Sequence, residues 1–328
     1  MKLVTYQDPG GADRIGALVA NDSKIVDLQG AQEAASGKPD PAFASMLALI
    51  EAGDAALDRA RGLAASAKDG RAVVARDAVK LRAPIPVPPQ IRDCLCFEQH
   101  LVNAFTMARK LRAAAAPDPE AALKEIEAKG LFRIPEVWYQ QPIYYKSNRF
   151  SVIGTDQDIE WPFYAEKLDF ELEFGCFLKK GGKNIPKDKA REHIFGYSIF
   201  NDVSARDTQV VEMAGNLGPA KSKDFDTGNV IGPCIVTADD FDPYHQTMIA
   251  RINGVEWSRG ETGTMHWSFE DLIAYISRSE TLHPGEFIGS GTVGGGCGLE
   301  QNRFLAPGDL IELEVTGIGV LRNRIVRN

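Results

Sequence analysis

The sequence lacks the features that mark several large classes of protein. Its 328 residues include only five cysteines and no Cys-x-x-Cys pair, which argues against a disulfide scaffold and a thiolate zinc site. No stretch approaches the roughly 18 apolar residues of a membrane span, and Asp8 and Pro9 interrupt the N-terminus before a signal segment could form. There is no long basic block, and 45 acidic against 37 basic side chains give a formal charge of −8, which argues against nucleic-acid binding. We therefore expect a cytoplasmic protein that acts on a small molecule, with neither a membrane nor a nucleic acid as its partner.

What is present is the composition of a folded globular protein. Hydrophobic residues make up 44% and charged residues 25% of the chain, both close to the average for such proteins. At roughly 150 residues per domain, the length suggests about two domains. The proline-rich run Ala83–Pro89 is stiff and unsuited to a central strand. We place a domain boundary there, which predicts a small N-terminal domain over residues 1–82 and a larger one over 83–328.

Local patterns predict strands and helices in both domains. The N-terminal domain has short apolar runs bounded by turn residues, which predict strands at Lys2–Tyr6, Ile15–Ala20 and Ile25–Leu28. Helical spacing follows over Phe43–Lys68, broken by Gly53, and again over Cys94–Glu127, interrupted near Pro117.

The rest of the larger domain is predicted to be mainly strands. They are expected at Lys167–Leu178, Ile194–Phe200, Asn229–Thr237, Met248–Val255, Phe287–Thr292 and Leu310–Thr316. One helix is expected over Ser268–Ser277, with Ser268 as its N-cap. The fold class is therefore α+β and rich in β-structure, with a helical insertion near the start of the main domain and a small N-terminal β/α domain.

An acidic pattern stands out between residues 169 and 174. Because side chains alternate along a strand, Asp169, Glu171 and Glu173 share one face. The pattern has two interpretations: a solvated face on an edge strand, or carboxylates gathered around a hard cation such as Mg²⁺, which prefers oxygen ligands.

A second acidic element lies at the end of an apolar strand. The run from Gly196 to Phe200 changes abruptly to polar residues at Asn201 and Asp202. Asp202 would project at the strand end, where sheet proteins often build sites, but the same residues also suit an ordinary turn. The residues alone leave these two interpretations open.

The two acidic elements together resemble a known family. The runs Asp169–Gly175 and Gly196–Gln209 closely resemble the fumarylacetoacetate hydrolase family. The resemblance continues through Lys221–Thr227, Ile231–Pro233, Asn253–Glu256, Gly289–Thr292 and Leu305–Asp309. It covers the chain from about Pro142 to the C-terminus and is only loose over the first 80 residues. It implies a mixed β-sandwich roll around a carboxylate-bound Mg²⁺ or Mn²⁺ (Ca²⁺ being a further candidate), usually in a homodimer.

The resemblance also assigns roles to individual residues. Glu171, Glu173 and Asp202 fall on the metal-ligand positions, and Asp93, seven residues before His100, adds a fourth. An anionic keto-acid substrate would be oriented by polar and basic residues, and the match gives these as Tyr145, Arg206, Gln209, Lys223 and Thr292. Without the family, Arg206 and Lys223 would be interpreted as surface salt-bridge partners.

A base is needed beside the metal, and His100 is the candidate among five histidines. Decarboxylase-type members pair this histidine with a glutamate three residues later, where this chain has Asn103. In the hydrolases the partner glutamate follows the Gly-Thr motif, which is Gly291-Thr292 here, so Glu300 is the corresponding candidate. His100, Glu300 and Lys223 are thus the predicted catalytic group, and residues 101–141 are the predicted helical lid.

These assignments predict a metal-dependent hydrolase that cleaves a carbon–carbon bond in an acylpyruvate or related 1,3-diketo acid. Such a reaction is typical of aromatic catabolism. His100 would activate a water that attacks the carbonyl, and the metal would stabilise the enolate leaving group. The alternative is decarboxylation or tautomerisation (isomerisation) of a 2-keto diacid at the same metal site. A metal-binding descendant without activity is a third possibility, which the retained site residues oppose.

Overall fold

The computed structural model describes residues 1–67, 70 and 72–327. The N-terminal part is an antiparallel β-meander with helices on one side, formed by β1 (Lys2–Gln7), β2 (Asp13–Val19), β3 (Lys24–Asp27), β4 (Val73–Ala75), α1 (Leu28–Ser36), α2 (Met46–Glu51) and α3 (Asp54–Ser66). Gly53 separates α2 from α3 with a φ of +75°, a conformation that favours glycine. The predicted helical spacing is confirmed up to Ser66, and its expected end at Lys68 lies outside the described residues.

The N-terminal strands continue into the large sheet of the molecule, because β1 pairs antiparallel with β14 (Asn229–Thr237). The order of the sheet is β4-β3-β2-β1-β14-β12-β11-β17-β6-β7. Its further strands are β12 (Ile194–Asp202), β11 (Leu172–Leu178), β17 (Phe287–Gly289), β6 (Ile91–Cys94) and β7 (Tyr144–Lys146), with β5 (Lys80–Leu81) on β1 and β8 (Val152–Ile153) on β14.

A second sheet packs on one face of the large sheet. Its order is β16-β15-β18-β19-β9, and its strands are β16 (Val255–Glu261), β15 (Thr247–Ile252), β18 (Leu310–Val315), β19 (Gly319–Val326) and β9 (Ile159–Glu160). The main core lies between the two sheets, with Phe174, Ile199 and Leu313 fully buried in it. A second core joins the opposite face of the large sheet to α2 and α3. The predicted α+β, β-rich fold is confirmed.

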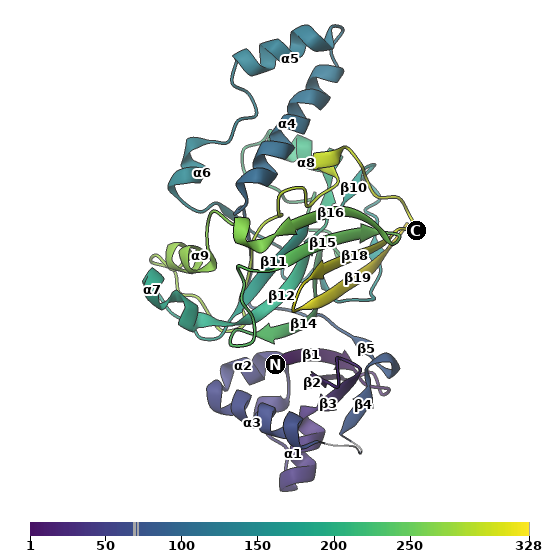
Figure 1. Cartoon of the computed structure of the whole chain (residues 1–328), viewed down its shortest axis with the longest axis vertical. Coiled ribbons are helices and arrows are strands. Elements are labelled where there is room, and N and C mark those ends of the chain that lie inside the picture. The colour runs from purple at the N-terminus through teal and green to yellow at the C-terminus, as the bar shows by residue number, and fades with distance from the viewer. Residues whose placement is uncertain (68–69, 71, 328) are drawn as a thin grey trace.

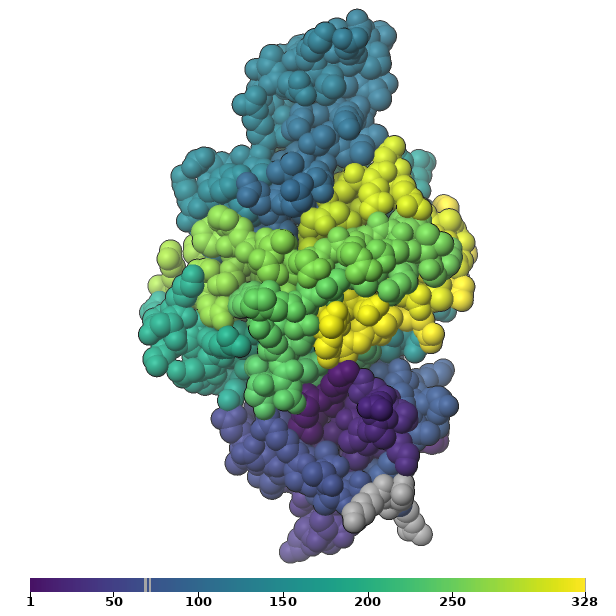
Figure 2. Space-filling view, viewed as in Figure 1, coloured from purple at the N-terminus to yellow at the C-terminus, as the bar shows by residue number. Residues whose placement is uncertain are grey.

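The helical insertion consists of α4 (Glu98–Ala114), α5 (Pro119–Ala128) and α6 (Glu136–Gln140). In Figure 1, α4 and α5 project from the end of the molecule opposite α1–α3, and Figure 2 shows the same arrangement with the β-rich body in between. The prediction that the helix begins at Cys94 was wrong, because Cys94 ends β6 and α4 starts at Glu98. The expected interruption lies between α4 and α5, where Asp118 caps α5 and Pro119 occupies its first turn.

The remaining elements are short. They are α7 (Lys187–Ala190), α8 (Arg206–Met213), α9 (Phe269–Ile276), the small ladder of β10 (Leu168–Asp169) with β13 (Ser204–Ala205), and five 3₁₀ turns at Pro41–Phe43, Arg76–Ala78, Arg191–His193, Thr262–Thr264 and Leu299–Gln301. Ser268 caps α9 as predicted, in a capping box with Asp271. Among residues 1–67 and 72–327, no helix is long and apolar enough to cross a membrane.

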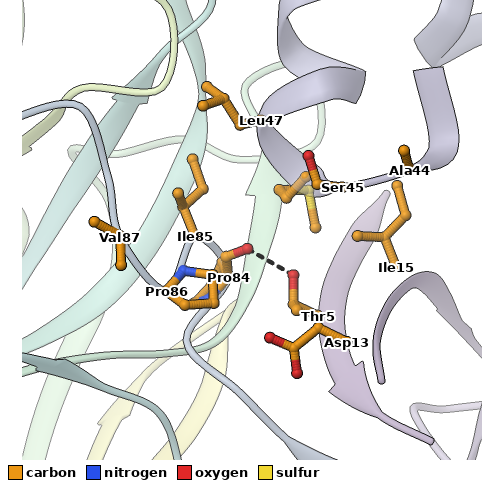
Figure 3. Close-up of a pocket in the computed structure, with 11 residues that line it drawn as sticks. Thr5, Asp13, Ile15, Ala44, Ser45, Leu47, Pro84, Ile85, Pro86 and Val87 are labelled. Atoms are coloured by element: carbon orange, nitrogen blue, oxygen red, sulfur yellow. Dashed lines mark hydrogen bonds between the residues drawn. The ribbon is translucent and has the colours of Figure 1, made fainter. Parts of the chain in front are cut away.

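The proline-rich run connects the N-terminal strands to the main body. Thr5 Oγ1 donates a 2.6 Å hydrogen bond to the carbonyl of Pro84, beside a cavity of about 210 Å³ (Figure 3). β1, before this run, pairs with β14, after it, so one sheet includes strands from both sides of the expected boundary. The division into two domains stays a prediction.

Candidate active site

The acidic segment leads into the middle of the large sheet. Asp169 ends β10, Glu171 forms an isolated bridge with Cys297, and Glu173 lies on β11, which pairs with β12 on one side and with β17 on the other. All three acids are at most 6% exposed. The interpretation as a solvated face of an edge strand is therefore wrong. Burial of unpaired carboxylates is costly, so each of the three must have a compensating partner.

Three acids from neighbouring parts of the sheet converge: Asp93 on β6, Glu173 on β11 and Asp202 at the end of β12. Each offers an oxygen within 4.8 Å of the others, and all three are buried. Within the described part of the chain, Asp93 Oδ1, Glu173 Oε2 and Asp202 Oδ1 have no hydrogen-bond partner. Buried oxygens without partners are rare, and three that converge are the ligand set of a hard divalent cation. The residues present thus fit Mg²⁺ or Mn²⁺.

The protonation of this cluster supports the same interpretation. Burial and the nearby charge of Asp202 raise the pKa of Asp93 to about 8. Burial and the charge of Asp93 raise the pKa of Glu173 well above its usual range. Burial also raises the pKa of Asp202 to about 6, against the opposing charge of Lys223. Without a cation, the cluster therefore retains protons near neutral pH.

Glu171 lies beside this group but is held by two basic residues. Its Oε2 is 2.6 Å from Lys223 Nζ, and its Oε1 is 2.8 Å from the guanidinium of Arg206. Burial alone would raise the pKa of Glu171, but the two positive charges outweigh it and lower the pKa to about 2. Lys223 also lies 2.6 Å from Asp202 Oδ2 and so connects Glu171 to the three converging acids. A role of Glu171 as a metal ligand stays a prediction.

Arg206 and Lys223 are only 5% and 2% exposed, so their interpretation as surface salt-bridge residues is wrong. Asp169 anchors Arg206, because its Oδ2 accepts a 2.8 Å hydrogen bond from Nε of the guanidinium. Asp169 also accepts hydrogen bonds from two backbone N–H groups in the segment that follows β17. The predicted Gln209 accepts a hydrogen bond from Arg206 at 2.9 Å. Sequence reasoning placed Asp169 on the same face as Glu171 but missed that it anchors Arg206.

Two further predicted residues contact the converging acids. The hydroxyl of Tyr145, on β7, donates to Asp202 Oδ2 at 2.5 Å. Thr292, just after β17, donates to Glu173 Oε1 at 3.1 Å. Both hydroxyl groups therefore orient a carboxylate whose second oxygen remains free for a cation.

His100 lies in the first turn of α4 and is 7% exposed. Its Nδ1 is 2.8 Å from Glu300 Oε1, although the two residues are 200 positions apart. The other oxygen of Glu300 accepts hydrogen bonds from Asn103 Nδ2 and from the backbone N–H of Gly295, both at 2.7 Å. With Glu300 ionised, Nδ1 donates its proton to the carboxylate, and the lone pair of Nε2 is free to accept one.

Asn103 thus has a contact that sequence reasoning missed. It follows His100 by three residues, so the two side chains share one face of α4. The sequence argument treated Asn103 only as the absence of a glutamate, whereas its amide holds Glu300 in place. A backbone bridge between Glu171 and Cys297 joins the segment that carries Glu300 to the acidic strand.

Comparison with known proteins gives the family. The model of the fumarylacetoacetate (FAA) hydrolase C-terminal domain matches residues 91–326. The chain belongs to this family. It is 30% identical over 316 residues to oxaloacetate tautomerase YisK of Bacillus subtilis, and the alignment covers 94% of this chain and 95% of the relative. It is 29% identical over 333 aligned positions to the mitochondrial oxaloacetate tautomerase fahd2 of Xenopus laevis, covering 99% and 90%.

A solved structure agrees over the full length. The fumarylacetoacetate hydrolase of Exiguobacterium antarcticum superposes with a TM-score of 0.72 at 25% identity and covers all of both chains. The protein is therefore a member of an enzyme superfamily whose members are named for more than one reaction. The two relatives are named as oxaloacetate tautomerases and the solved structure as a hydrolase, so the comparisons do not single out hydrolysis.

Proposed function

We propose that the protein is a divalent-metal-dependent tautomerase that interconverts the keto and enol forms of a small 2-oxo dicarboxylic acid such as oxaloacetate. The observation that carries the proposal is the buried His100–Glu300 pair, which the Glu171–Cys297 bridge connects to the segment that carries Glu173, one of three converging carboxylates with free oxygens. The two tautomerase relatives, each aligned over more than nine-tenths of this chain, favour this reaction within the family.

The cation would be held by Asp93, Glu173 and Asp202, with Glu171 close by. When bound, Mg²⁺ or Mn²⁺ supplies positive charge that polarises the 2-oxo group and offsets the negative charge of its enolate. Arg206 is assigned to a substrate carboxylate by the family resemblance, and its guanidinium has the fork of donors that such a group requires; its Nη2 lies 2.8 Å from Glu171 Oε1. Gln209 and Asp169 fix the orientation of that guanidinium.

The proton transfer requires one base. Nε2 of His100 removes a proton from C3 of the keto acid, the C–H electron pair becomes the C2–C3 double bond, and the C2=O π pair moves onto the oxygen. The imidazolium then returns the proton to that oxygen, which regenerates the base. One proton leaves carbon and one arrives at oxygen, so the reaction is balanced without a co-reactant. Glu300 stabilises the imidazolium that forms, and Asn103 keeps the carboxylate of Glu300 in position.

Hydrolysis of an acylpyruvate is the second candidate. The observation that favours it is the origin of the carboxylate: Glu300 comes from the loop beyond Thr292, the position that the resemblance assigned to the hydrolases. The same Nε2 would then remove a proton from water instead of carbon. The two candidates differ in product, so one experiment separates them.

The test uses enzyme loaded with Mn²⁺ and two substrates. With oxaloacetate, we expect the decay of enol absorbance to exceed the buffer rate, and this acceleration to disappear with EDTA and fall by about 10²–10⁴-fold in His100→Ala. His245→Ala is the matched control, because His245 is exposed and pairs with Asp242 on the surface. With an acylpyruvate, release of pyruvate faster than oxaloacetate tautomerisation would overturn the proposal in favour of hydrolysis.

A further inference from the structure

A second group of potential metal ligands adjoins the acid–base pair. A ring nitrogen of His100, Sγ of Cys297 and a carboxylate oxygen of Glu300 all lie within 4.8 Å of one another. Glu300 Oε1 is 2.8 Å from the imidazole nitrogen and 3.5 Å from the sulfur. An N–H and an S–H therefore point at the same oxygen, an arrangement in which one cation can replace two protons.

This group differs in chemistry from the carboxylate cluster. Asp93, Glu173 and Asp202 offer only oxygen, which suits Mg²⁺ and Mn²⁺. The second group offers nitrogen, sulfur and oxygen, which suits borderline and soft cations such as Zn²⁺ and Cd²⁺. The two sets share no residue, so they can select different metals within one active site.

We propose that His100, Cys297 and Glu300 form a second metal site, selective for Zn²⁺-like cations, whose occupation inactivates the acid–base pair. The binding part of this proposal depends only on the three side chains. The inactivation rests on the proposed function, since it requires His100 to act as a base.

The distances fit such a cation with little movement. Zinc binds nitrogen, oxygen and sulfur at about 2.0–2.3 Å, so a tetrahedral site separates N from O by about 3.4 Å and S from O by about 3.6 Å. The corresponding separations here are 2.8 Å and 3.5 Å. Of these two separations, the His100–Glu300 contact has to open by roughly 0.6 Å given these bond lengths, and the ring nitrogen and the sulfur lie within 4.8 Å of each other. Asn103 and the backbone N–H of Gly295 already orient Glu300 through its other oxygen.

The proton balance explains the inactivation. Coordination takes the proton from the thiol of Cys297 and releases it to solvent. Coordination at Nδ1 of His100 moves the imidazole proton to Nε2. The site then holds a dication, a thiolate and a carboxylate, so its charge changes from −1 to zero. An Nε2 that already carries a proton cannot accept another, and the base is lost.

Binding is tested with Cd²⁺ as the probe, because a cadmium–thiolate bond absorbs in the ultraviolet. The enzyme is stripped with EDTA and reloaded with Mn²⁺ to fill the carboxylate cluster before titration. We expect one absorbing equivalent per chain in the parent, its displacement by Zn²⁺, and its loss in both Cys297→Ala and Cys297→Ser. Cys234→Ala is the matched control, since Cys234 is equally buried but lies on β14.

Inhibition is measured on the same variants, each normalised to its own rate without Zn²⁺. The Zn²⁺ concentration for half-inhibition should rise at least about tenfold in Cys297→Ala and stay unchanged in Cys234→Ala. No absorbing equivalent in the folded parent, or one that persists in both Cys297 variants, would overturn the site. Binding through Cys297 that leaves turnover unaffected would overturn the inactivation. Binding in an enzyme without turnover would support the site and count against the proposed function alone.

Discussion

Replacing Asp93 by asparagine should make the metal-free protein more stable while removing its response to divalent cations. Burial and the charge of Asp202 raise the pKa of Asp93 from 3.8 to about 8 in the folded state. Between about pH 4 and 8 the folded state holds the proton of this carboxyl while the unfolded state has lost it. The metal-free protein therefore loses stability as pH rises over this range. Asparagine has a similar shape and no proton to lose, so it removes this penalty.

The size of the effect follows from the shift. At pH 7 the folded state keeps this proton, and the unfolded state has lost it. Because pH 7 lies about three units above the pKa of the unfolded state, the difference amounts to about 4 kcal/mol of unfolding free energy. Relaxation and hydration return part of this penalty, which leaves about 2–4 kcal/mol. An unfolding entropy of about 2.1 cal/mol/K per residue amounts to roughly 0.7 kcal/mol/K for this chain, so Tm should rise by about 3–6 °C.

The assay is thermal unfolding with EDTA at pH 5, 7 and 8, repeated with Mn²⁺. Binding of Mn²⁺ at a hundred times its Kd should stabilise the parent by about 2.7 kcal/mol, whereas Asp93→Asn should respond little. Asp169→Asn is the control of opposite sign: this equally buried acid is paired with Arg206 at 2.8 Å, and breaking a buried pair costs about 3–5 kcal/mol. If Asp93→Asn melts below the parent at pH 7 without metal, the reasoning is wrong.

Three further predictions concern the rest of the site and the assembly. Glu300→Gln should lower kcat by about 10²–10⁴-fold while the Tm shift with Mn²⁺ is kept, since only the orientation of His100 is lost; stopped-flow rates within threefold of the parent would contradict this. Lys223→Met should destabilise the metal-free protein by about 3–5 kcal/mol at pH 7 in urea unfolding, because Glu171 and Asp202 lose a buried cation. In the parent, the lowered pKa of Glu171 adds stability that is lost as pH falls from 4.5 towards 2, so the deficit of the variant should shrink there; a constant deficit would refute the ion-pair argument. We also propose a homodimer that covers Val211 and Leu217, which are 75% and 98% exposed; Leu217→Asp should shift sedimentation from dimer to monomer, and a monomeric parent would exclude it.

The elements that could be predicted from the sequence are those whose signals are local. Asn229–Thr237 was predicted to the residue, because two β-branched apolar stretches on either side of Gly232-Pro233 lie between polar residues. Ser268 and Asp271 mark the start of α9 through a capping box, which is also local. Cys94 was misassigned because β6 has only four residues and its partners are distant in sequence: β17 pairs with Ile91–Asp93, and Tyr144 on β7 pairs with Cys94. The helical spacing that begins at Glu98 was therefore extended wrongly into the strand.

The site shows the same limit. Alternation placed Glu171 and Glu173 on one face of a strand, but their burial depends on which strands flank β11, and those are distant in sequence. Pairing of His100 with Glu300 spans 200 residues, so only the family resemblance could suggest it. The hydrogen bond from Asn103 to Glu300 had a local signal in the three-residue spacing from His100, and it was overlooked because an amide was not considered as support for a distant carboxylate.

The two halves of the site are built on parts of the fold that differ in how freely they can change. Asp93, Glu173 and Asp202 stand on paired strands of the large sheet, so the register of the sheet fixes their relative positions. The acid–base pair instead joins the first turn of α4 to a short turn at Leu299–Gln301, both at the edge of the helical insertion. A family can therefore keep one metal site and vary the base, its supporting carboxylate and the insertion. Relatives of one fold are named for tautomerisation and for hydrolysis, which is what we expect if the carboxylate cluster is kept while the acid–base pair changes.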